Sequence, residues 1–138
     1  MKTETDTLPD KLSDLIEVAL DDLEKTAVDP RYRVNMNTWH TPHKGVCHVC
    51  LAGAVMAQTL KLDPVVDYVR DRSLYAVDRK LSALNNVRLG SVQLALDNMG
   101  FKDAPHWSRM EVPHYNVDAA GFKTTLRQLA TELRAKGY

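Results

Sequence analysis

Apolar residues recur at intervals of three and four positions near both ends of the chain, and this spacing is typical of amphipathic helices. The two stripes are Leu12, Leu15, Ile16, Ala19, Leu20 and Leu23, and then Phe122, Leu126, Leu129, Ala130 and Leu133. Pro9 suits the first turn of a helix, and Asp118 can cap one. The pattern therefore predicts an N-terminal helix within residues 1–30 and a last helix that begins after Asp118.

The middle of the chain carries a different pattern. Residues 46–60, VCHVCLAGAVMAQTL, are almost uncharged and apolar on every side, which predicts a buried central helix. Asp63-Pro64 has the form of a helix start, and apolar stripes between residues 74 and 99 predict further helices. Residues 101–117 contain two prolines and predict a long loop. Apolar and polar residues alternate from Tyr32 to Thr38, which predicts a short strand.

These elements predict a mainly α fold: one compact domain over residues 1–138, with five to six helices and a minor β element of one to two strands. A length of 138 residues suits a single domain. Hydrophobic residues make up 44% and charged residues 26%, as in ordinary soluble globular proteins. Gly53 and the neighbouring alanines would let another backbone or a ligand approach the central helix closely.

Several features predict a cytoplasmic protein. No apolar run approaches the roughly 20 residues of a membrane span, so we expect no membrane partner. The N-terminus, MKTETDTLPD, is acidic and polar, unlike a secretory signal. Two cysteines do not form a disulfide framework, which favours a reducing compartment. A net charge of +0 and an apolar, small-residue helix tolerate self-association, and this leaves a homodimer open.

Charge is balanced overall but not along the chain. Residues 1–30 hold nine acids and three bases, whereas the other 108 residues hold nine acids and fifteen bases. We favour an acidic helix that packs on a mildly basic body; the alternative is an acidic face that binds a basic partner or mimics a nucleic acid. The bases of the body alternate with acids and form no phosphate-tracking stripe, so direct nucleic-acid binding is not expected.

Histidine and tryptophan gather in two segments, Trp39–Cys50 and 101–117. Their aromatic and hydrogen-bonding groups suit a planar ligand such as a nucleotide, and amides around Lys44-Gly45-Val46, at the start of the predicted helix, could hold a phosphate. The predicted binding residues are Trp39, His40, His43, Lys44, Gly45, His106, Trp107, His114 and Tyr115. We expect the two segments to share one solvent-reachable niche.

Zinc binding is one alternative. His40, His43, Cys47 and Cys50 read H-x2-H-x3-C-x2-C, and their side chains are the ligand types of tetrahedral zinc. The spacing argues against it, because zinc fingers separate their ligand pairs by about a dozen residues or more, and here three residues intervene. A site with one cysteine and a distant histidine from 101–117 is a further variant. We favour no cofactor, with zinc as the alternative.

A cysteine nucleophile is a second alternative. Cys47 or Cys50 near a helix start could have a stabilised thiolate, with His106 or His114 as the base. The string KGVCHVCLAGA resembles the papain-family segment in which the second cysteine is catalytic, but leucine follows Cys50 where that family has tryptophan. Cys-x2-Cys at a helix start also resembles thioredoxin, which needs a βαβ framework that this sequence lacks.

Burial is the remaining interpretation of the cysteines. Cysteine is among the residue types most often buried in proteins. Cys47 and Cys50 lie three positions apart in an apolar segment, so both are expected to fit in a core.

The segment WHTPHKGVCHVCLAGAVMAQTL, with the later LSALNNVRLG, resembles small uncharacterised proteins encoded by tailed bacteriophages and prophages. The resemblance implies expression in a bacterial cytoplasm during infection, where such accessory proteins often block a host component. We therefore expect a non-enzymatic binder that antagonises a host protein of a defence, replication or transcription system, or a nucleotide-like small ligand. The alternative is a small cysteine- or zinc-dependent enzyme built on Cys47 or Cys50 with a loop histidine.

Overall fold

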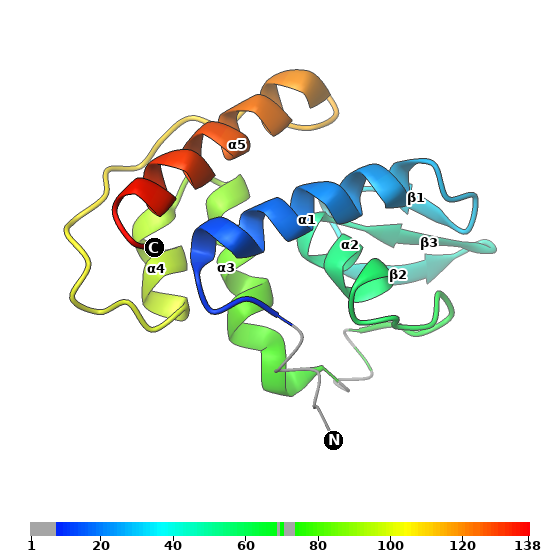
Figure 1. Ribbon diagram of the computed structural model, residues 1–138. Helices are drawn as coiled ribbons and strands as arrows, with labels where there is room; N and C mark the ends of the chain where they lie inside the picture. Colours follow the sequence, from blue (N-terminus) through cyan, green and yellow to red (C-terminus); the bar gives the residue numbers. More distant parts are fainter. Residues whose placement is uncertain (1–7, 69, 71–73) are drawn as a thin grey trace.

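The computed structural model describes residues 8–68, 70 and 74–138, in which α-helices pack around one another and against a small sheet (Figure 1). The elements in chain order are α1 (Leu12–Ala27), β1 (Tyr32–Val34), β2 (His40–His43), β3 (Val46–Val49), α2 (Leu51–Gln58), the short 3-10 helix η2 (Tyr75–Val77), α3 (Asp78–Arg88), α4 (Val92–Asn98) and α5 (Ala119–Ala135). The long loop 101–117 contains no helix or strand, as predicted.

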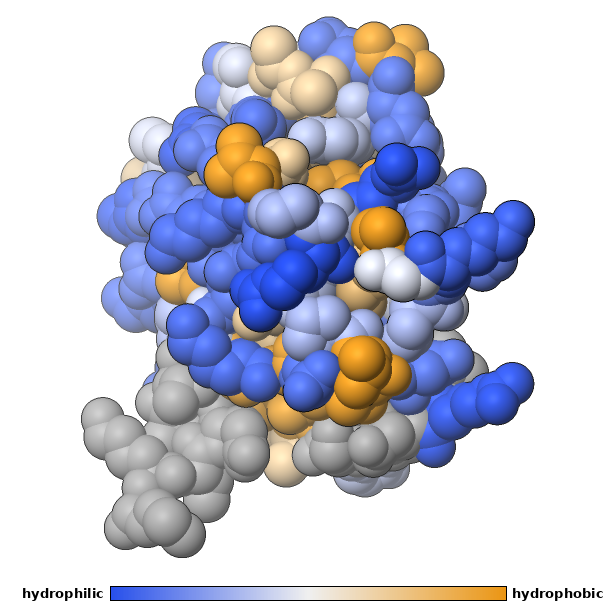
Figure 2. All heavy atoms as spheres, turned by 90° about the vertical axis from the view of Figure 1, so that its right-hand side faces the viewer, coloured by the Kyte–Doolittle hydropathy of each residue, from blue (hydrophilic) through white to orange (hydrophobic). Residues whose placement is uncertain are grey.

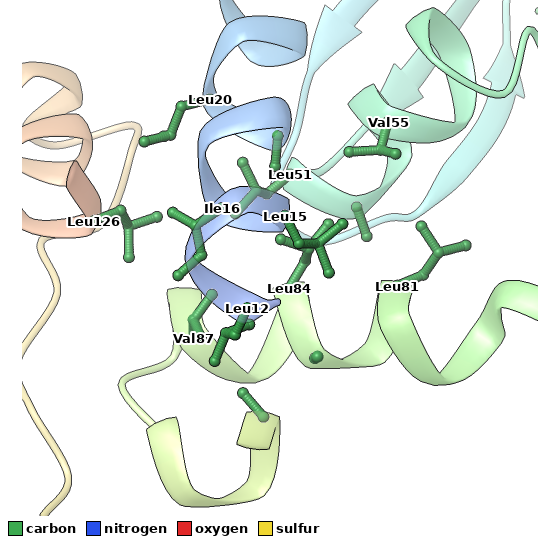
Figure 3. Packing of buried hydrophobic residues seen from close by; sticks show 14 of the residues in the cluster. Leu12, Leu15, Ile16, Leu20, Leu51, Val55, Leu81, Leu84, Val87 and Leu126 are labelled. Atoms are coloured by element: carbon green, nitrogen blue, oxygen red, sulfur yellow. The ribbon is translucent and has the colours of Figure 1, made fainter. Parts of the chain in front are cut away.

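Helix α1 lies at the centre of the fold and contacts α2, α3, α5 and β1. Every residue of its predicted apolar stripe is fully buried. Figure 3 shows Leu12, Leu15 and Ile16 pointing toward side chains of neighbouring helices, among them Leu84 of α3 and Leu126 of α5. Burial of one such side chain contributes about 1.5–3 kcal/mol. The stripe therefore provides much of the main core.

Helix α5 packs along α1 and compensates its negative charge. The Nη2 atom of Arg134 lies 2.8 Å from Glu17 Oε2 and 3.1 Å from Asp14 Oδ1. Arg127 Nη2 lies 3.3 Å from Glu24 Oε1. The acidic N-terminal helix thus packs on bases of its own chain, which confirms the favoured interpretation of the charge asymmetry.

The sheet has the order β1-β3-β2, with β3 parallel to β1 and antiparallel to β2. Lys44 (φ 50°) and Gly45 (φ 81°) connect β2 to β3. Positive φ at both central residues is the geometry of a two-residue type I′ hairpin turn. Alternation along β3 then directs Cys47 and Val49 to the buried inner face, and leaves His48 on the outer face.

The predicted fold class is wrong in its β content. The described residues form five α-helices and a three-stranded mixed sheet, which is a mixed α/β fold and not a mainly α one. The predicted central helix 46–60 divides into β3 and α2. Uniform apolarity does not distinguish a buried strand from a buried helix, and the Lys44-Gly45 turn returns the chain alongside β2.

Two further predictions concern where helices begin. No helix begins at Asp63-Pro64 within residues 63–68; instead, Asp63 Oδ1 accepts a hydrogen bond from Val65 N at 3.0 Å in a local turn. Asp118 does cap α5, because its Oδ1 accepts from Gly121 N at 2.9 Å. Among the described residues, none of the helices combines the length and apolar character that crossing a membrane requires.

The loop 101–117 runs along α4 and α5, at the end of the molecule away from the sheet (Figure 1). Gly90, between α3 and α4, holds the middle of this loop in place. Met110 N donates to Gly90 O at 3.1 Å. A Cβ added at Gly90 would lie 1.9 Å from Met110 O, and the φ of +84° also favours glycine. This contact places the central part of the loop next to the end of α3.

Candidate functional site

The first predicted segment forms ordered structure instead of an open loop. The ring of Trp39 stacks on Tyr68 with 5.6 Å between centroids and 3° between planes. Lys44 and Gly45 form the hairpin turn before β3, whereas the nearest helix, α2, begins only at Leu51. The phosphate site predicted around Lys44-Gly45-Val46 therefore lacks the helix amides that it was expected to use.

His40 is completely buried and connects β2 to the segment 63–68. Its Nδ1 lies 2.7 Å from Val66 O, and its own carbonyl oxygen accepts from Tyr68 N at 3.0 Å. Because a carbonyl oxygen can only accept, Nδ1 carries the proton of the neutral ring. Nε2 is buried without a hydrogen-bond partner in the described part of the chain. Burial lowers the pKa of His40, so the ring is a neutral core group.

The two cysteines are free and buried, as one interpretation of the sequence expected. Cys47 Sγ lies 3.5 Å from His40 Nδ1, but this nitrogen already donates to Val66 O and cannot take the thiol proton. Burial raises the pKa of Cys47 to about 12 and also raises the pKa of Cys50. Both thiols are therefore protonated near neutral pH, and neither has the features of an activated nucleophile.

The four predicted zinc ligands are not assembled. His40 and Cys47 lie on the buried inner face of the sheet, and Cys50 belongs to the main core beside α2. His43 is exposed on the opposite face, since strand residues alternate in direction. Within residues 8–68, 70 and 74–138, no three His, Cys, Asp or Glu side chains gather in a way that could hold a metal ion.

The second predicted segment stays accessible. His106 and His114 are exposed, and Trp107 and Tyr115 are half-buried. Lys136 Nζ lies 5.2 Å from the ring centroid of Trp107, and Tyr115 contacts Phe122 edge to face at 5.7 Å. Both cysteines are buried, whereas His106 and His114 are exposed, and no hydrogen bond joins either of these histidines to a cysteine among the described residues.

A groove follows this loop. Two hollows, of about 510 and 220 Å³, share Leu89, Arg109, Val112 and Pro113 in their walls, and we name them together the Arg109 groove. The larger hollow adds Met110, Glu111 and Thr125. The smaller one adds Met36, Arg88, His114, Tyr115 and Phe122. A third hollow of about 350 Å³, beside His106 and Trp107, is also lined by Arg109.

Two arginines of the groove carry unbalanced charge. Arg88 Nε donates to Asn85 Oδ1 at 2.8 Å, and Arg109 Nη1 donates to Ser91 Oγ at 3.0 Å. Neither forms an ion pair with a carboxylate in the part of the chain that the structure describes. Burial lowers the pKa of Arg88, and the nearby Cys50 opposes this effect. The positive charge is thus partly removed from water. A guanidinium group remains charged even so.

Sequence reasoning missed both arginines. Arg88 belongs to the bases that alternate with acids, and Arg109 lies in the loop with one other base, Lys102. The signal that could have found them is Gly90, which lies two residues after Arg88 and allows the loop backbone at Met110 to approach. That close approach brings the end of α3 and residue 109 to the walls of one groove.

The expected common niche is not formed. Trp39 stacks on Tyr68 and His40 contacts Val66, whereas His106 and His114 belong to the loop 101–117. None of the hollows of the loop is lined by a residue of 39–45. The predicted set is therefore dispersed. Trp39 and His40 pack inside the fold, His43, Lys44 and Gly45 are exposed at the hairpin, and the residues of the loop lie along its hollows.

Comparison with protein-family models, with curated proteins and with solved structures finds no match to this chain.

Proposed function

We propose that this chain is a binding protein without catalytic activity, and that it holds a small anionic ligand of the nucleotide type in the Arg109 groove. The observation that carries the proposal is Arg88, a half-buried guanidinium without a carboxylate partner among the described residues. Burial of an unpaired charge is unfavourable. A bound anion would remove this penalty and form charge-assisted hydrogen bonds, each of which contributes about 1.5–3 kcal/mol.

The geometry of Arg88 suits a phosphate group. Asn85 occupies only the Nε position of the guanidinium. The two terminal nitrogens remain available for a bidentate contact, and such forks match phosphate oxygens. Arg109 and His114 line the same hollow and can supply further donors.

The rest of the groove suits the remainder of a nucleotide. The larger hollow, of about 510 Å³, has Leu89, Met110 and Val112 in its wall together with Thr125 and Glu111. Ligand pockets for small molecules commonly span about 300–1,000 Å³, with apolar walls and a few polar groups that fix orientation. The groove thus combines a cationic end with a mixed apolar and polar end.

For the biological role, we propose that the chain sequesters this ligand and so antagonises a host component in a bacterial cytoplasm. The support is the resemblance of the segment around residues 39–60 to small phage-encoded proteins. A host protein that presents an acidic group to the groove is the alternative partner. Both thiols are protonated in the core, so no observation favours the cysteine- or zinc-dependent enzyme.

Isothermal titration of the protein with inorganic phosphate, AMP and GMP tests this proposal. We expect a 1:1 complex with a nucleotide that weakens about tenfold or more in Arg88→Ala, since a charge-assisted pair is lost. Arg88→Lys keeps the charge without the fork and should give an intermediate affinity. Arg33→Ala is the matched control, because Arg33 also lacks a carboxylate partner among the described residues but lies on β1.

Two results would contradict the proposal. One is the absence of any anion binding by the wild-type protein. The other is equal weakening by Arg88→Ala and Arg33→Ala, which would indicate a general charge effect. Mass spectrometry of the ligand after incubation should recover it unchanged, whereas a converted product would show catalysis.

A further inference from the structure

The outer face of the sheet brings together two histidines from neighbouring strands. In the register of β2 and β3, His43 is opposite Val46 and His48 is opposite Thr41, so the two histidines are diagonal neighbours on one face. Their ring centroids lie 5.8 Å apart with 74° between the ring planes. His43 is exposed and His48 is half-buried. Figure 2 shows that hydrophilic side chains dominate the end of the molecule that carries this sheet.

We propose that His43 and His48 together bind one divalent transition-metal ion of the Cu²⁺, Ni²⁺ or Zn²⁺ type. An imidazole nitrogen binds such an ion at about 2.0–2.1 Å, which places the ring centroid about 3.2 Å from the metal. Two rings at a roughly tetrahedral angle then have centroids about 5.2 Å apart. The observed 5.8 Å is of the same order as this separation, and the exposed His43 side chain must turn its ring to bring a nitrogen toward the common ion.

Burial and nearby positive charge both act on His48. A histidine must be neutral at the nitrogen that binds a metal. Partial burial, with help from the nearby His43 and Arg33, lowers the pKa of His48. These influences favour the neutral form of the ring. The positive charge of Arg33 repels a metal cation as it repels a proton, so Arg33→Ala should strengthen metal binding.

Asn35 determines which nitrogen of His48 binds the ion. Asn35 Oδ1 accepts from Asn37 N at 3.0 Å, which directs its Nδ2 toward His48 Nδ1 at 3.4 Å. In this arrangement Nδ1 accepts and Nε2 carries the proton. When a metal binds Nε2, the proton of the ring must be on Nδ1. There it faces the N–H group of the Asn35 amide, which cannot accept it. An aspartate at position 35 would accept the Nδ1 proton, as carboxylates do behind many metal-bound histidines.

We expect a surface site from which the bound ion can exchange with ions in solution. The described residues place no group of three or more candidate ligands together, so the chain supplies two nitrogens and water completes the coordination. Affinity should follow the usual order for first-row ions, with Cu²⁺ bound more tightly than Ni²⁺ or Zn²⁺. The site is distinct from the Arg109 groove, and neither depends on the other.

Titration of the untagged protein with Ni²⁺, followed by calorimetry, tests the site. We expect one bound ion, with affinity reduced at least about tenfold in His43→Ala and in His48→Ala. His106→Ala and His114→Ala are matched controls, since they remove exposed histidines elsewhere and should leave the affinity for Ni²⁺ unchanged. Asn35→Asp should bind about tenfold more tightly. Circular dichroism checks that each variant is folded.

Several outcomes would overturn the proposal. Unchanged Ni²⁺ affinity in His43→Ala or His48→Ala would exclude the pair. Loss of binding in His106→Ala or His114→Ala would assign the ion to another part of the chain. Unchanged binding in Asn35→Asp would contradict coordination through Nε2 of His48.

Discussion

The sheet end and the loop end of the molecule both carry histidine and an aromatic ring, but they use them differently. At the sheet end, His40 is 0% exposed, bonds Val66 O and lies beside a protonated thiol. At the loop end, His114 is exposed and lines a groove with Arg88 and Arg109, whose charges have no carboxylate partner in the described chain. Because both ends carry the same residue types, our proposal places the ligand where unpaired charge lies beside a hollow.

The largest effect is expected at the sheet end, from Gly53→Ala. The added Cβ would lie 1.6 Å from Trp39 O and 2.8 Å from Val49 Cβ, so α2 and β2 would have to separate. We expect a loss of about 3 kcal/mol or more in the free energy of unfolding, measured with urea. Gly45→Ala is the control, because nothing lies within 4 Å of the added atom there and only the strain of φ +81° remains. Equal losses in both would contradict the close packing of α2 on β2.

At the loop end, the corresponding change is Gly90→Ala. The added Cβ would lie 1.9 Å from Met110 O, and the loop can shift outward where α2 cannot. We expect a smaller loss of stability than in Gly53→Ala, of about 2 kcal/mol, together with a clear loss of nucleotide affinity. Nucleotide affinity equal to that of the wild type would show that the middle of the loop does not shape the groove.

His40→Ala should destabilise the sheet end by about 2–4 kcal/mol, because it leaves a cavity and removes the bond to Val66 O. His114→Ala, which removes an exposed ring, should have almost no effect on the urea midpoint. The order of the two variants is reversed for nucleotide binding, which His114→Ala should weaken modestly. Equal destabilisation by the two variants would remove the contrast between the buried and the exposed histidine.

The pH dependence of stability sharpens the same contrast. Burial lowers the pKa of His40 below its usual 6.5, so the folded state binds a proton on this ring less readily than the unfolded state does. The stability contributed by the neutral ring is complete above about pH 6.5 and is lost as the pH falls from there through the lowered folded-state pKa. His48 acts in the same direction, by less, because it is more exposed. Urea midpoints at pH 7.5, 6.5 and 5.5 should fall in the wild type and fall less steeply in His40→Gln. An unchanged slope in that variant would contradict a buried neutral His40.

The smallest effect is expected from Arg134→Ala on α5. Arg134 bonds Glu17 and Asp14, but all three side chains are about half exposed. Exposed ion pairs contribute little and are screened by salt. A small drop in the unfolding midpoint at low salt that disappears at 1 M NaCl is the expected result. A drop that persists at 1 M NaCl would show that Arg134 acts through packing.

Helices whose apolar residues repeat along one face could be predicted from the sequence. The stripes of α1 and α5 occupy the predicted positions, and Asp118 caps α5, because these signals are local. The close approach expected at Gly53 also occurs, with the Trp39 backbone as the neighbour. The strand within 46–60 could not be predicted from periodicity, since its pairing with β1 involves residues 15 positions away, such as Tyr32 and Cys47.

The site could be predicted only in part. His114 and Tyr115 do line the groove, but Trp39 and His40 were assigned to the wrong environment, because burial of a histidine depends on tertiary contacts such as Val66 O. For Arg88 the sequence offers only the indirect signal of the neighbouring Gly90, because the significance of Arg88 is a missing partner. A sequence shows which charges exist but not which of them are left unpaired after folding.

Two-dimensional amide NMR during titration with AMP, with inorganic phosphate as the reference anion, tests the central claim most directly. The account predicts shift changes concentrated at residues 88–91 and 109–115, with the amides of 39–49 unaffected. Changes concentrated at 39–49, or spread evenly over the chain, would contradict the assignment of ligand binding to the Arg109 groove.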